Sequence, residues 1–440
     1  MKKKIAFYLE NEDIRDIDFR YPEKGNPGCG GTEYLFTATP YYLSTLKKNK
    51  YTIVLIANCI KRLPDNLYLA CADNLEDAAR TAKKLGCDIF IYRPRRDIKL
   101  DITPLIDNLR LLSIAWAHVQ LPPETLKKMA KSDYLKKLVC VEHEQYDAIQ
   151  DTALAALKRL TFIVNGFDLD GFRLSSIPNK DKKLVVYIGA LVPQKGFHVL
   201  ARAWPNVIKT HPDARLIVIG SSTLYDHNSS LGPWGVADKS YEEEEIIPHL
   251  KGKDGNPHKS VFFAKRLGHE KKEILHKALI GVANPTGISE NCPGSSLEFS
   301  ASGTAVISGA YFGMVDVIKH KETGLLGKKI DDLTMNICKL IENPKIAIKM
   351  GEEGVNYVQM RYNWKNVINE WDALINSIVN DSDTPRIPFK KNIFFNYKIL
   401  VMLNRFLQIT LGSFIDWPSL GEFKIIIKLK FYKLKKFVFR

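Results

Sequence analysis

The chain has 440 residues and a mass of 50.0 kDa, which exceeds one ordinary domain and predicts two or three. A composition of 45% hydrophobic and 26% charged residues is typical of a globular protein with a sizeable core. The net charge is +15, and residues 380–440 hold twelve Lys and Arg against four Asp and Glu. The seven cysteines are scattered without a CxxC pair, which argues against a disulfide framework or a zinc site and indicates a reducing compartment.

The first part of the chain alternates short apolar runs with helical patterns such as residues 76–86. The apolar run that follows MKKK is too short for a signal peptide, so it predicts a strand. The runs typical of buried strands are 3–10, 51–58, 87–93, 111–117, 137–142 and 160–166. Near-continuous apolar strands separated by helices predict a parallel sheet covered on both faces.

After the polar stretch 172–183, typical of a linker, the same pattern restarts. An amphipathic helix is predicted at 198–211, and 221–250 has the character of a loop insertion whose role we do not assign. The predicted strands are 183–189, 214–220, 260–264, 279–285 and 304–309. The fold class is therefore α/β, with two doubly wound Rossmann-like domains and a ligand site in the cleft between them.

We predict four parts of the chain. They are an N-terminal domain over 1–175, a second domain over 176–361, a helix over 362–380 that packs back towards the first domain, and a basic tail over 381–440. A Rossmann-like sheet raises the alternative of hydride transfer. The expected G-x-G-x-x-G does not follow the first strand, since the glycine cluster comes later, at 25–33, and this argues against a nicotinamide site.

Glycines 28, 30 and 31 precede a predicted helix for which Thr32 stands where an N-cap would. Glycines allow close backbone approach, and a helix N-terminus attracts anions, so this cluster is either an anion site or a plain surface loop. Lys195, in the loop after a strand, is either a phosphate partner or a solvated lysine.

The stretch 285–309 carries the strongest signal, because a strand, a turn and a helix place Glu290 and Glu298 eight positions apart. The amides of Gly294, Ser295 and Ser296 would open that helix and suit a diphosphate. Glu298 could then accept hydrogen bonds from vicinal ribose hydroxyls. The alternative is that Glu298 only complements the helix dipole and that Glu290 is solvated.

These residues resemble the retaining GT-B glycosyltransferases of family GT4, or glycosyltransferase group 1. Glu290 and Glu298 fit the Glu-x7-Glu motif of the family, and the SASGTAVIS that follows is similar to its next segment. The blocks GMVDVIKHKETGLL, IVNGFDLDGF and GCGGTE resemble further family elements, with Asp316 where Glu is more common. The resemblance covers residues 1 to about 380.

The resemblance implies a role for each matching residue. Glu298 would hold the ribose, Glu290 would contact the donor sugar, and His118 would face that sugar from the first domain. Lys195 would bind the diphosphate, helped by the amides of Gly294, Ser295 and Ser296 and by Gly30 and Gly31. The family transfers sugars with retention and needs no metal or cofactor, and the leaving diphosphate is thought to assist deprotonation of the acceptor.

One departure concerns the diphosphate. Ala190 stands where the family usually has an arginine. Either one contact is missing, or Arg266 or Lys265 supplies it. Losing a charged hydrogen bond of this kind costs about 1.5–3 kcal/mol, which weakens a donor site without abolishing it.

Residues 389–440 interleave basic and aromatic residues with long aliphatic ones. Lys398, Asn404, Arg405 and Gln408 interrupt the first apolar piece, so the tail is expected to lie on an anionic membrane surface rather than to span it. Packing as ordinary core is an alternative. Nucleic acid would use the same charges, but the aliphatic density favours lipid.

The sequence thus predicts a cytoplasmic enzyme, peripheral on the inner face of the plasma membrane. It would move a sugar from a UDP- or GDP-sugar to a glycan or lipid-linked acceptor in cell-surface polysaccharide biosynthesis. Two rivals stay open: a nucleotide-sugar epimerase of the same fold, and a membrane-associated scaffold that has lost activity, for which Ala190 is the main argument.

Overall fold

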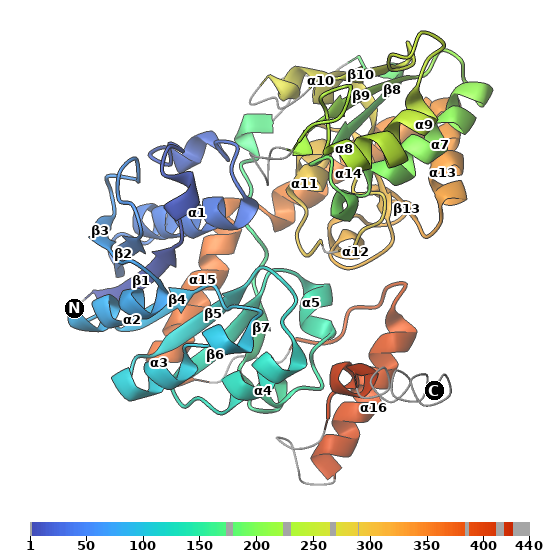
Figure 1. The fold of residues 1–440 in the computed structure, drawn as a ribbon. Coiled ribbons are helices and arrows are strands. Elements are labelled where there is room, and N and C mark those ends of the chain that lie inside the picture. The colour runs from blue at the N-terminus through green and yellow to red at the C-terminus, as the bar shows by residue number, and fades with distance from the viewer. Residues whose placement is uncertain are drawn as a thin grey trace, which may run out of the picture. The chain divides into compact units, whose positions relative to one another are not determined.

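The structure is a computed structural model, and it describes residues 2–172, 179–222, 230–264, 270–288, 290–382, 387–410 and 418–425. The chain divides into two compact units, each built on its own sheet (Figure 1). The first unit comprises the residues up to Pro22, Gly30–Asn165, and the chain from Val367 onward. The second unit comprises Glu23–Cys29 and Gly166–Asn366.

The sheet of the first unit has seven parallel strands in the order β3-β2-β1-β4-β5-β6-β7. The central residues of β1, β2, β4, β5 and β6 are buried, which explains the continuous apolar runs in the sequence. The strands are β1 (Lys3–Leu9), β2 (Tyr51–Ala57), β3 (Tyr68–Cys71), β4 (Ile89–Tyr92), β5 (Ser113–Ala117), β6 (Leu135–Cys140) and β7 (Leu160–Phe162).

The helices of the first unit follow the expected alternation, with one correction at the first of them. Gly30, not Thr32, is the N-cap of α1, so Thr32 lies within the helix. Gly30 is extended there and the cap has no side-chain hydrogen bond. The helices are α1 (Gly31–Leu46), α2 (Leu75–Lys84), α3 (Thr103–Leu109), α4 (Pro123–Ala130), α5 (His143–Asp147) and α6 (Ala153–Ala156), with short 3-10 turns at Glu12–Ile14, Pro22–Lys24 and Ile98–Leu100.

The sheet of the second unit has six parallel strands in the order β10-β9-β8-β11-β12-β13. They are β8 (Asp181–Ile188), β9 (Arg215–Ile219), β10 (Val261–Phe263), β11 (Ala278–Ala283), β12 (Ala305–Gly309) and β13 (Gly324–Gly327). The helices are α7 (Phe197–Thr210), α8 (Lys239–Tyr241), α9 (Ile247–Leu250), α10 (Lys271–Lys277), α11 (Gly294–Ala301), α12 (Met314–Val317), α13 (Ile330–Glu342) and α14 (Pro344–Arg361), with a π-helical turn at Glu242–Ile246 and 3-10 turns at Asp170–Phe172 and Pro193–Lys195.

Part of the insertion at 221–250 is organised by one buried carboxylate. Glu242 is fully buried and accepts hydrogen bonds from the backbone N–H groups of Trp234, Val236 and Ala237, the last two at 2.9 and 2.8 Å. Such charge-assisted bonds fix a loop as regular structure would. The described part, 230–250, is therefore a structured loop that runs into α8 and α9.

Helix α15 (Trp364–Val379) packs on the sheet of the first unit from Val367 onward. Its Trp371 is fully buried, with its ring centroid 6.3 Å from that of Phe7 and 5.0 Å from that of Trp116. Asp372 accepts the hydroxyl of Tyr51 at 2.6 Å and pairs with Lys50 at 2.7 Å. The last named helix, α16 (Phe395–Thr410), also belongs to the first unit.

A buried lysine of the second unit provides a pH-dependent test of the fold. Lys180 donates to the hydroxyl of Thr304 at 2.8 Å and to the carbonyl of Ser302 at 3.1 Å, and burial lowers its pKa to about 7. The unfolded state therefore binds more protons between pH 7 and 10, so Lys180 makes stability rise with pH in that window.

We expect Lys180→Met to reduce the rise in melting temperature that thermal unfolding shows between pH 7 and pH 9. The exposed neighbour Lys182 is the matched control, and Lys182→Met should leave the rise as in the wild type. Equal pH dependence in all three proteins would contradict the assignment.

Candidate functional site

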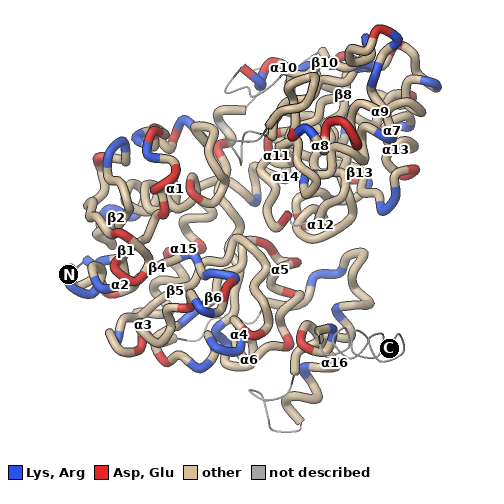
Figure 2. Tube along the Cα trace, viewed as in Figure 1, with Lys and Arg blue, Asp and Glu red and all other residues tan. Residues whose placement is uncertain are grey.

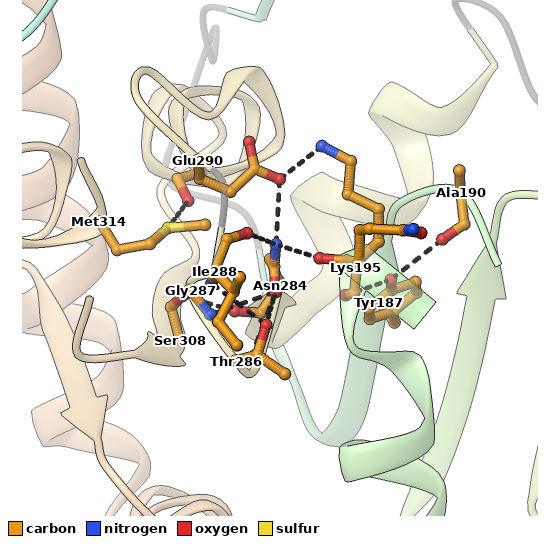
Figure 3. Close-up of polar contacts among 12 residues, drawn as sticks. Tyr187, Ala190, Lys195, Asn284, Thr286, Gly287, Ile288, Glu290, Ser308 and Met314 are labelled. Carbon is orange, nitrogen blue, oxygen red and sulfur yellow. Dashed lines mark hydrogen bonds and ion pairs between the residues drawn. The ribbon is translucent and has the colours of Figure 1, made fainter. Parts of the chain in front are cut away.

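Asn284 organises the loop that leaves β11 in the second unit (Figure 3). Its Oδ1 accepts hydrogen bonds from the hydroxyl of Thr286 at 2.7 Å and from the N–H of Gly287 at 3.1 Å. The hydroxyl of Ser308 on β12 donates to its carbonyl at 3.0 Å. Asn284 has a φ of +27°, a left-handed conformation that asparagine tolerates better than most residues. Its buried side chain fixes the start of the loop that carries Glu290.

The amide nitrogen of Asn284 connects this loop to the end of β8. Nδ2 donates to the carbonyl of Gln194 at 3.1 Å, to that of Ile288 at 3.2 Å and to Oε1 of Glu290 at 3.1 Å. The carboxyl ends of two neighbouring strands are thereby joined through one side chain.

Lys195 and Glu290 form the central contact of the site (Figure 3). Nζ of Lys195 lies 2.5 Å from Oε1 of Glu290, and the two side chains are 25% and 14% exposed. The hydroxyl of Tyr187 on β8 donates to the carbonyl of Lys195 at 3.0 Å, which holds the short turn from which the lysine extends. The cation and one of the two carboxylates singled out in the sequence are thus brought together within one unit.

The Ala190 position contributes no polar side chain to this site. Ala190 is 2% exposed, and its carbonyl accepts the hydroxyl of Tyr187 at 3.5 Å. The backbone approaches closely here, since a Cβ on Gly220 would lie 1.9 Å from the carbonyl oxygen of Gly189. Arg266 and Lys265, the expected substitutes for the family arginine, lie outside the described residues.

Helix α11 begins at Gly294, as the sequence predicts, and Pro293 is its N-cap. The N–H of Ser296 donates to the carbonyl of Pro293 at 3.2 Å, whereas Gly294 is exposed at the head of the helix. The side chain of Ser296 is buried, with Oγ 3.5 Å from the sulfur of Met314. Ser295 is half-buried in the first turn. Within the part of the chain that the structure describes, the N–H groups of Gly294 and Ser295 have no backbone acceptor.

Glu298 has one paired and one unpaired oxygen. Oε1 accepts a hydrogen bond from Nζ of Lys271 on α10 at 2.7 Å. Oε2 is buried and has no hydrogen-bond partner among the residues that the structure describes. Buried carboxylate oxygens are normally satisfied, so this one is able to accept a hydrogen bond from a donor outside the described residues.

Sequence reasoning missed both Asn284 and Lys271. We expected a strand through Pro285, which concealed that β11 ends at Ala283 and that a polar side chain follows directly. A search for the first polar residue after each buried strand finds Asn284. Lys271 stands in the charged run EKKE, which resembles any solvated helix start and carries no signal.

Gly30 and Gly31, the glycines of the first unit that we expected near the diphosphate, differ from each other in their surroundings. A Cβ on Gly30 would lie 2.1 Å from Oε2 of Glu33, whose other carboxylate oxygen is 3.1 Å from Arg93. Nothing lies within 4 Å of a Cβ on Gly31. The absence of a side chain at Gly30 therefore leaves room for the Glu33–Arg93 ion pair. A Cβ at position 31 would meet no neighbouring atom.

His118 follows β5 in the first unit and packs among aromatic rings. Its ring centroid is 4.4 Å from that of Trp116 and 5.7 Å from that of Phe36. Burial, and secondarily the charge of Arg93, lower the pKa of His118 to about 3. The imidazole is therefore neutral at physiological pH. A neutral imidazole can donate a hydrogen bond to a hydroxyl group through one ring nitrogen and accept one through the other.

The first unit also holds a cavity of about 760 Å³ that sequence reasoning did not predict. It lies where β1, β2 and β4 end, with Glu10, Asn58 and Arg93 in its lining. Its two arginines are both paired with carboxylates, Arg93 with Glu33 and Arg95 with Glu10. Among the described residues no cluster of three or more His, Cys, Asp or Glu could hold a metal ion.

Two parallel, doubly wound sheets with polar groups at the strand ends define an α/β protein of the GT-B fold. A solved glycosyltransferase of Rickettsia africae is 16% identical, with a TM-score of 0.63 over 87% of this chain and 100% of that one. The Anabaena protein HepE, solved with UDP and glucose, is 12% identical, with a TM-score of 0.60 over 85% and 100% of the two chains. At these identities the likeness shows the fold.

The second unit carries the likeness to a particular family. Residues 172–357 match the family described as Glycosyl transferases group 1. An uncharacterised glycosyltransferase of Methanocaldococcus jannaschii is 25% identical over 205 residues, 45% of this chain and 46% of that protein. A GDP-mannose-dependent phosphatidylinositol monomannoside mannosyltransferase of Mycobacterium tuberculosis is 23% identical over 48% and 54%. The chain thus spans about half the length of the curated relatives it matches.

Proposed function

We propose that the protein is a retaining glycosyltransferase of family GT4 that uses a nucleotide diphosphate-sugar as donor. The observation that carries the proposal is the contact of Lys195 with Glu290 at the joined ends of β8 and β11. This pair stands in the same unit as Glu298 and the first turn of α11. A cation, a helix N-terminus and two carboxylates together match the parts of a sugar nucleotide.

Each group has a role that follows from its chemistry. Lys195 and the amides of Gly294 and Ser295 bind the diphosphate, because a cation and a helix N-terminus both stabilise anionic oxygens. The buried Oε2 of Glu298 accepts a ribose hydroxyl. Glu290, already held by Lys195 and Asn284, hydrogen-bonds the donor sugar.

In the reaction, the bond from the anomeric carbon to the diphosphate oxygen breaks and a bond to the acceptor oxygen forms on the same face. The hydroxyl proton of the acceptor passes to the leaving diphosphate, so no separate protein base is required. Lys195 and the helix amides stabilise the charge that develops on this leaving group, which makes a metal ion unnecessary.

For the first unit we propose the acceptor side of the reaction. The cavity at the ends of β1, β2 and β4 would hold a glycan or the sugar of a lipid-linked acceptor, as expected of strand ends in such sheets. His118 would donate to or accept from a sugar hydroxyl, and Gly31 would let the backbone approach the donor. Ala190 would make donor binding weaker than with an arginine.

We further propose that the protein acts in cell-surface polysaccharide synthesis, in the cytoplasm at the inner face of the plasma membrane, through residues 389–440. Of these residues the structure describes 389–410 and 418–425. None of the described helices is long and apolar enough to cross a membrane.

The test is incubation with a panel of UDP- and GDP-sugars, with and without glycan and lipid-linked acceptors, followed by mass spectrometry. We expect a sugar to be added to an acceptor, with release of the nucleoside diphosphate. Conversion of the donor sugar without an acceptor would favour the epimerase instead. A wild-type protein that binds and converts no donor would favour the scaffold.

A further inference from the structure

Helix α16 is amphipathic, but its polar face, and not its apolar face, turns towards the protein. Globular proteins ordinarily turn the apolar stripe of a surface helix towards the core. In α16 the buried positions are Lys398, Val401, Asn404 and Gln408, which recur every three or four residues on one face. Three of the four are polar, so the polar face of this helix is the one that packs on the first unit.

The buried lysine of this face has a full set of partners. Nζ of Lys398 lies 2.7 Å from Oδ2 of Asp147 and 2.8 Å from Oε2 of Glu144, and it donates to the carbonyl of Lys390 at 2.9 Å. With the lysine only 1% exposed, the pair Asp147 and Lys398 is excluded from water and tightly oriented. The charge of Lys398 is thus used to hold the helix and does not reach the surface.

The rest of the polar face is satisfied in the same way. Asn404 donates to Oδ2 of Asp151 at 2.9 Å, and Gln408 donates to the carbonyl of Asp151 at 2.6 Å. Arg405 donates to the carbonyl of Gln150 at 3.2 Å and to its side-chain oxygen at 3.0 Å. Because these hydrogen bonds are directional, they determine which face of α16 turns outward.

The outward face is apolar from Ile399 to Ile409. Its large hydrophobic side chains are 40–61% exposed, and they are Ile399, Leu400, Leu403, Phe406, Leu407 and Ile409. In Figure 2 the tube of α16 is tan apart from its blue lysine and arginine. The helix carries no Asp or Glu. A contiguous apolar face of this kind marks an interaction surface rather than scattered exposed residues.

The charges around this face indicate which partner it fits. Lys391, before the helix, and Lys424, near Tyr397, are exposed, the latter with Nζ 4.4 Å from the tyrosine ring. Beyond the described residues, the sequence from 426 to 440 holds six Lys and Arg and no acid. An apolar stripe with flanking cations is complementary to a bilayer that has an acyl interior and anionic headgroups.

We propose that α16 lies in the plane of an anionic bilayer. Its polar face stays on the first unit, and the stripe defined by Ile399, Leu400, Leu403, Phe406, Leu407 and Ile409 inserts among the acyl chains. This inference rests on the peripheral-membrane part of the proposed function and is independent of the transferase activity. It identifies the helix face, and not the basic sequence alone, as the inserting surface.

The test is flotation of the full chain with vesicles of equal parts phosphatidylglycerol and phosphatidylcholine. We expect the double variant Leu403→Asp with Phe406→Asp to lose at least about tenfold in vesicle binding, because two exposed apolar side chains no longer enter the lipid. The matched control is Met335→Asp with Met360→Asp. These two methionines of the second unit are 60% and 68% exposed, and this control should float like the wild type. Because all four side chains are exposed, circular dichroism should show unchanged folding.

Three results would overturn the inference. A wild-type chain that does not float removes the membrane part of the proposed function and this inference with it. If the wild type floats and the double variant floats equally well, only this inference is refuted. Light scattering that shows a lipid-free dimer which the double variant dissociates would assign the stripe to a second copy of the chain.

Discussion

Replacing Glu298 by alanine should reduce sugar transfer by about a hundredfold or more while leaving the second unit folded. The buried Oε2 of Glu298 is placed to accept a hydrogen bond from the donor. A hydrogen bond between a carboxylate and a ribose hydroxyl contributes about 1.5–3 kcal/mol, and the upper end of this range corresponds to a factor of about a hundred. The measurement is the initial rate of transfer at a fixed donor concentration, with the melting temperature recorded beside it.

Two further variants separate donor binding from local packing. Glu298→Gln keeps the shape of the side chain and should retain more activity than the alanine variant, because an amide oxygen still accepts a hydrogen bond. Lys271→Met removes the partner of Oε1 without removing the carboxylate, so it should be less damaging than Glu298→Ala. Full transfer by Glu298→Ala would refute the role of this carboxylate.

Replacing Lys398 by methionine should release α16 from the first unit. Lys398 is the buried partner of both Asp147 and Glu144, and breaking a buried ion pair on one side costs about 3–5 kcal/mol, since a charge is left uncompensated. The measurement is hydrogen exchange of the amides in α16, which should become fast in the variant. The exposed Lys391 gives the matched control, and Lys391→Met should leave exchange unchanged. Equal protection in all three proteins would contradict the account.

The docking of α16 should also weaken in acid. Burial alone would raise the pKa of Asp147, but hydrogen bonds from His143 and Lys398 outweigh it and hold the pKa below its usual value. A carboxyl group with a lowered folded-state pKa contributes stability above its unfolded pKa and loses it as the pH falls. The protection factors of the α16 amides, which correct for the slower intrinsic exchange in acid, should therefore fall at low pH, and less so in Lys398→Met.

The main strands of both sheets could be predicted because they are buried on both faces and read as continuous apolar runs. The strands that we did not predict are β3 and β13. Tyr68 of β3 is 58% exposed at the edge of its sheet, and β13 is the short run GLLG, so neither has the apolar length that indicates a strand. In both cases the pairing with a neighbouring strand, which no local pattern encodes, makes the segment a strand.

In the candidate site, too, residues within one motif could be predicted, whereas contacts between distant segments could not. Spacing along one segment indicated Glu290, Glu298 and the start of α11. It could not indicate that Lys271 pairs with Glu298, or that Asn284 links the ends of β8 and β11. Those contacts depend on tertiary packing of segments that carry no motif of their own.

The tail illustrates a limit of periodicity. In the sequence, Lys398, Asn404 and Gln408 interrupt an apolar run, which does not indicate the face of a helix that turns inward. That choice depends on Asp147 and Asp151, some 250 positions earlier in the chain, whose hydrogen bonds bind the polar face.

The central claim, that the second unit binds the diphosphate of a sugar nucleotide through Lys195, is tested most directly by calorimetric titration of the full chain with UDP and with GDP. We expect one of the two nucleotides to bind in equimolar amount. We expect Lys195→Ala to weaken that binding by about ten- to a hundredfold, as the loss of one charged hydrogen bond implies. A wild-type protein that binds neither nucleotide, or a Lys195→Ala variant of unchanged affinity, would contradict the claim.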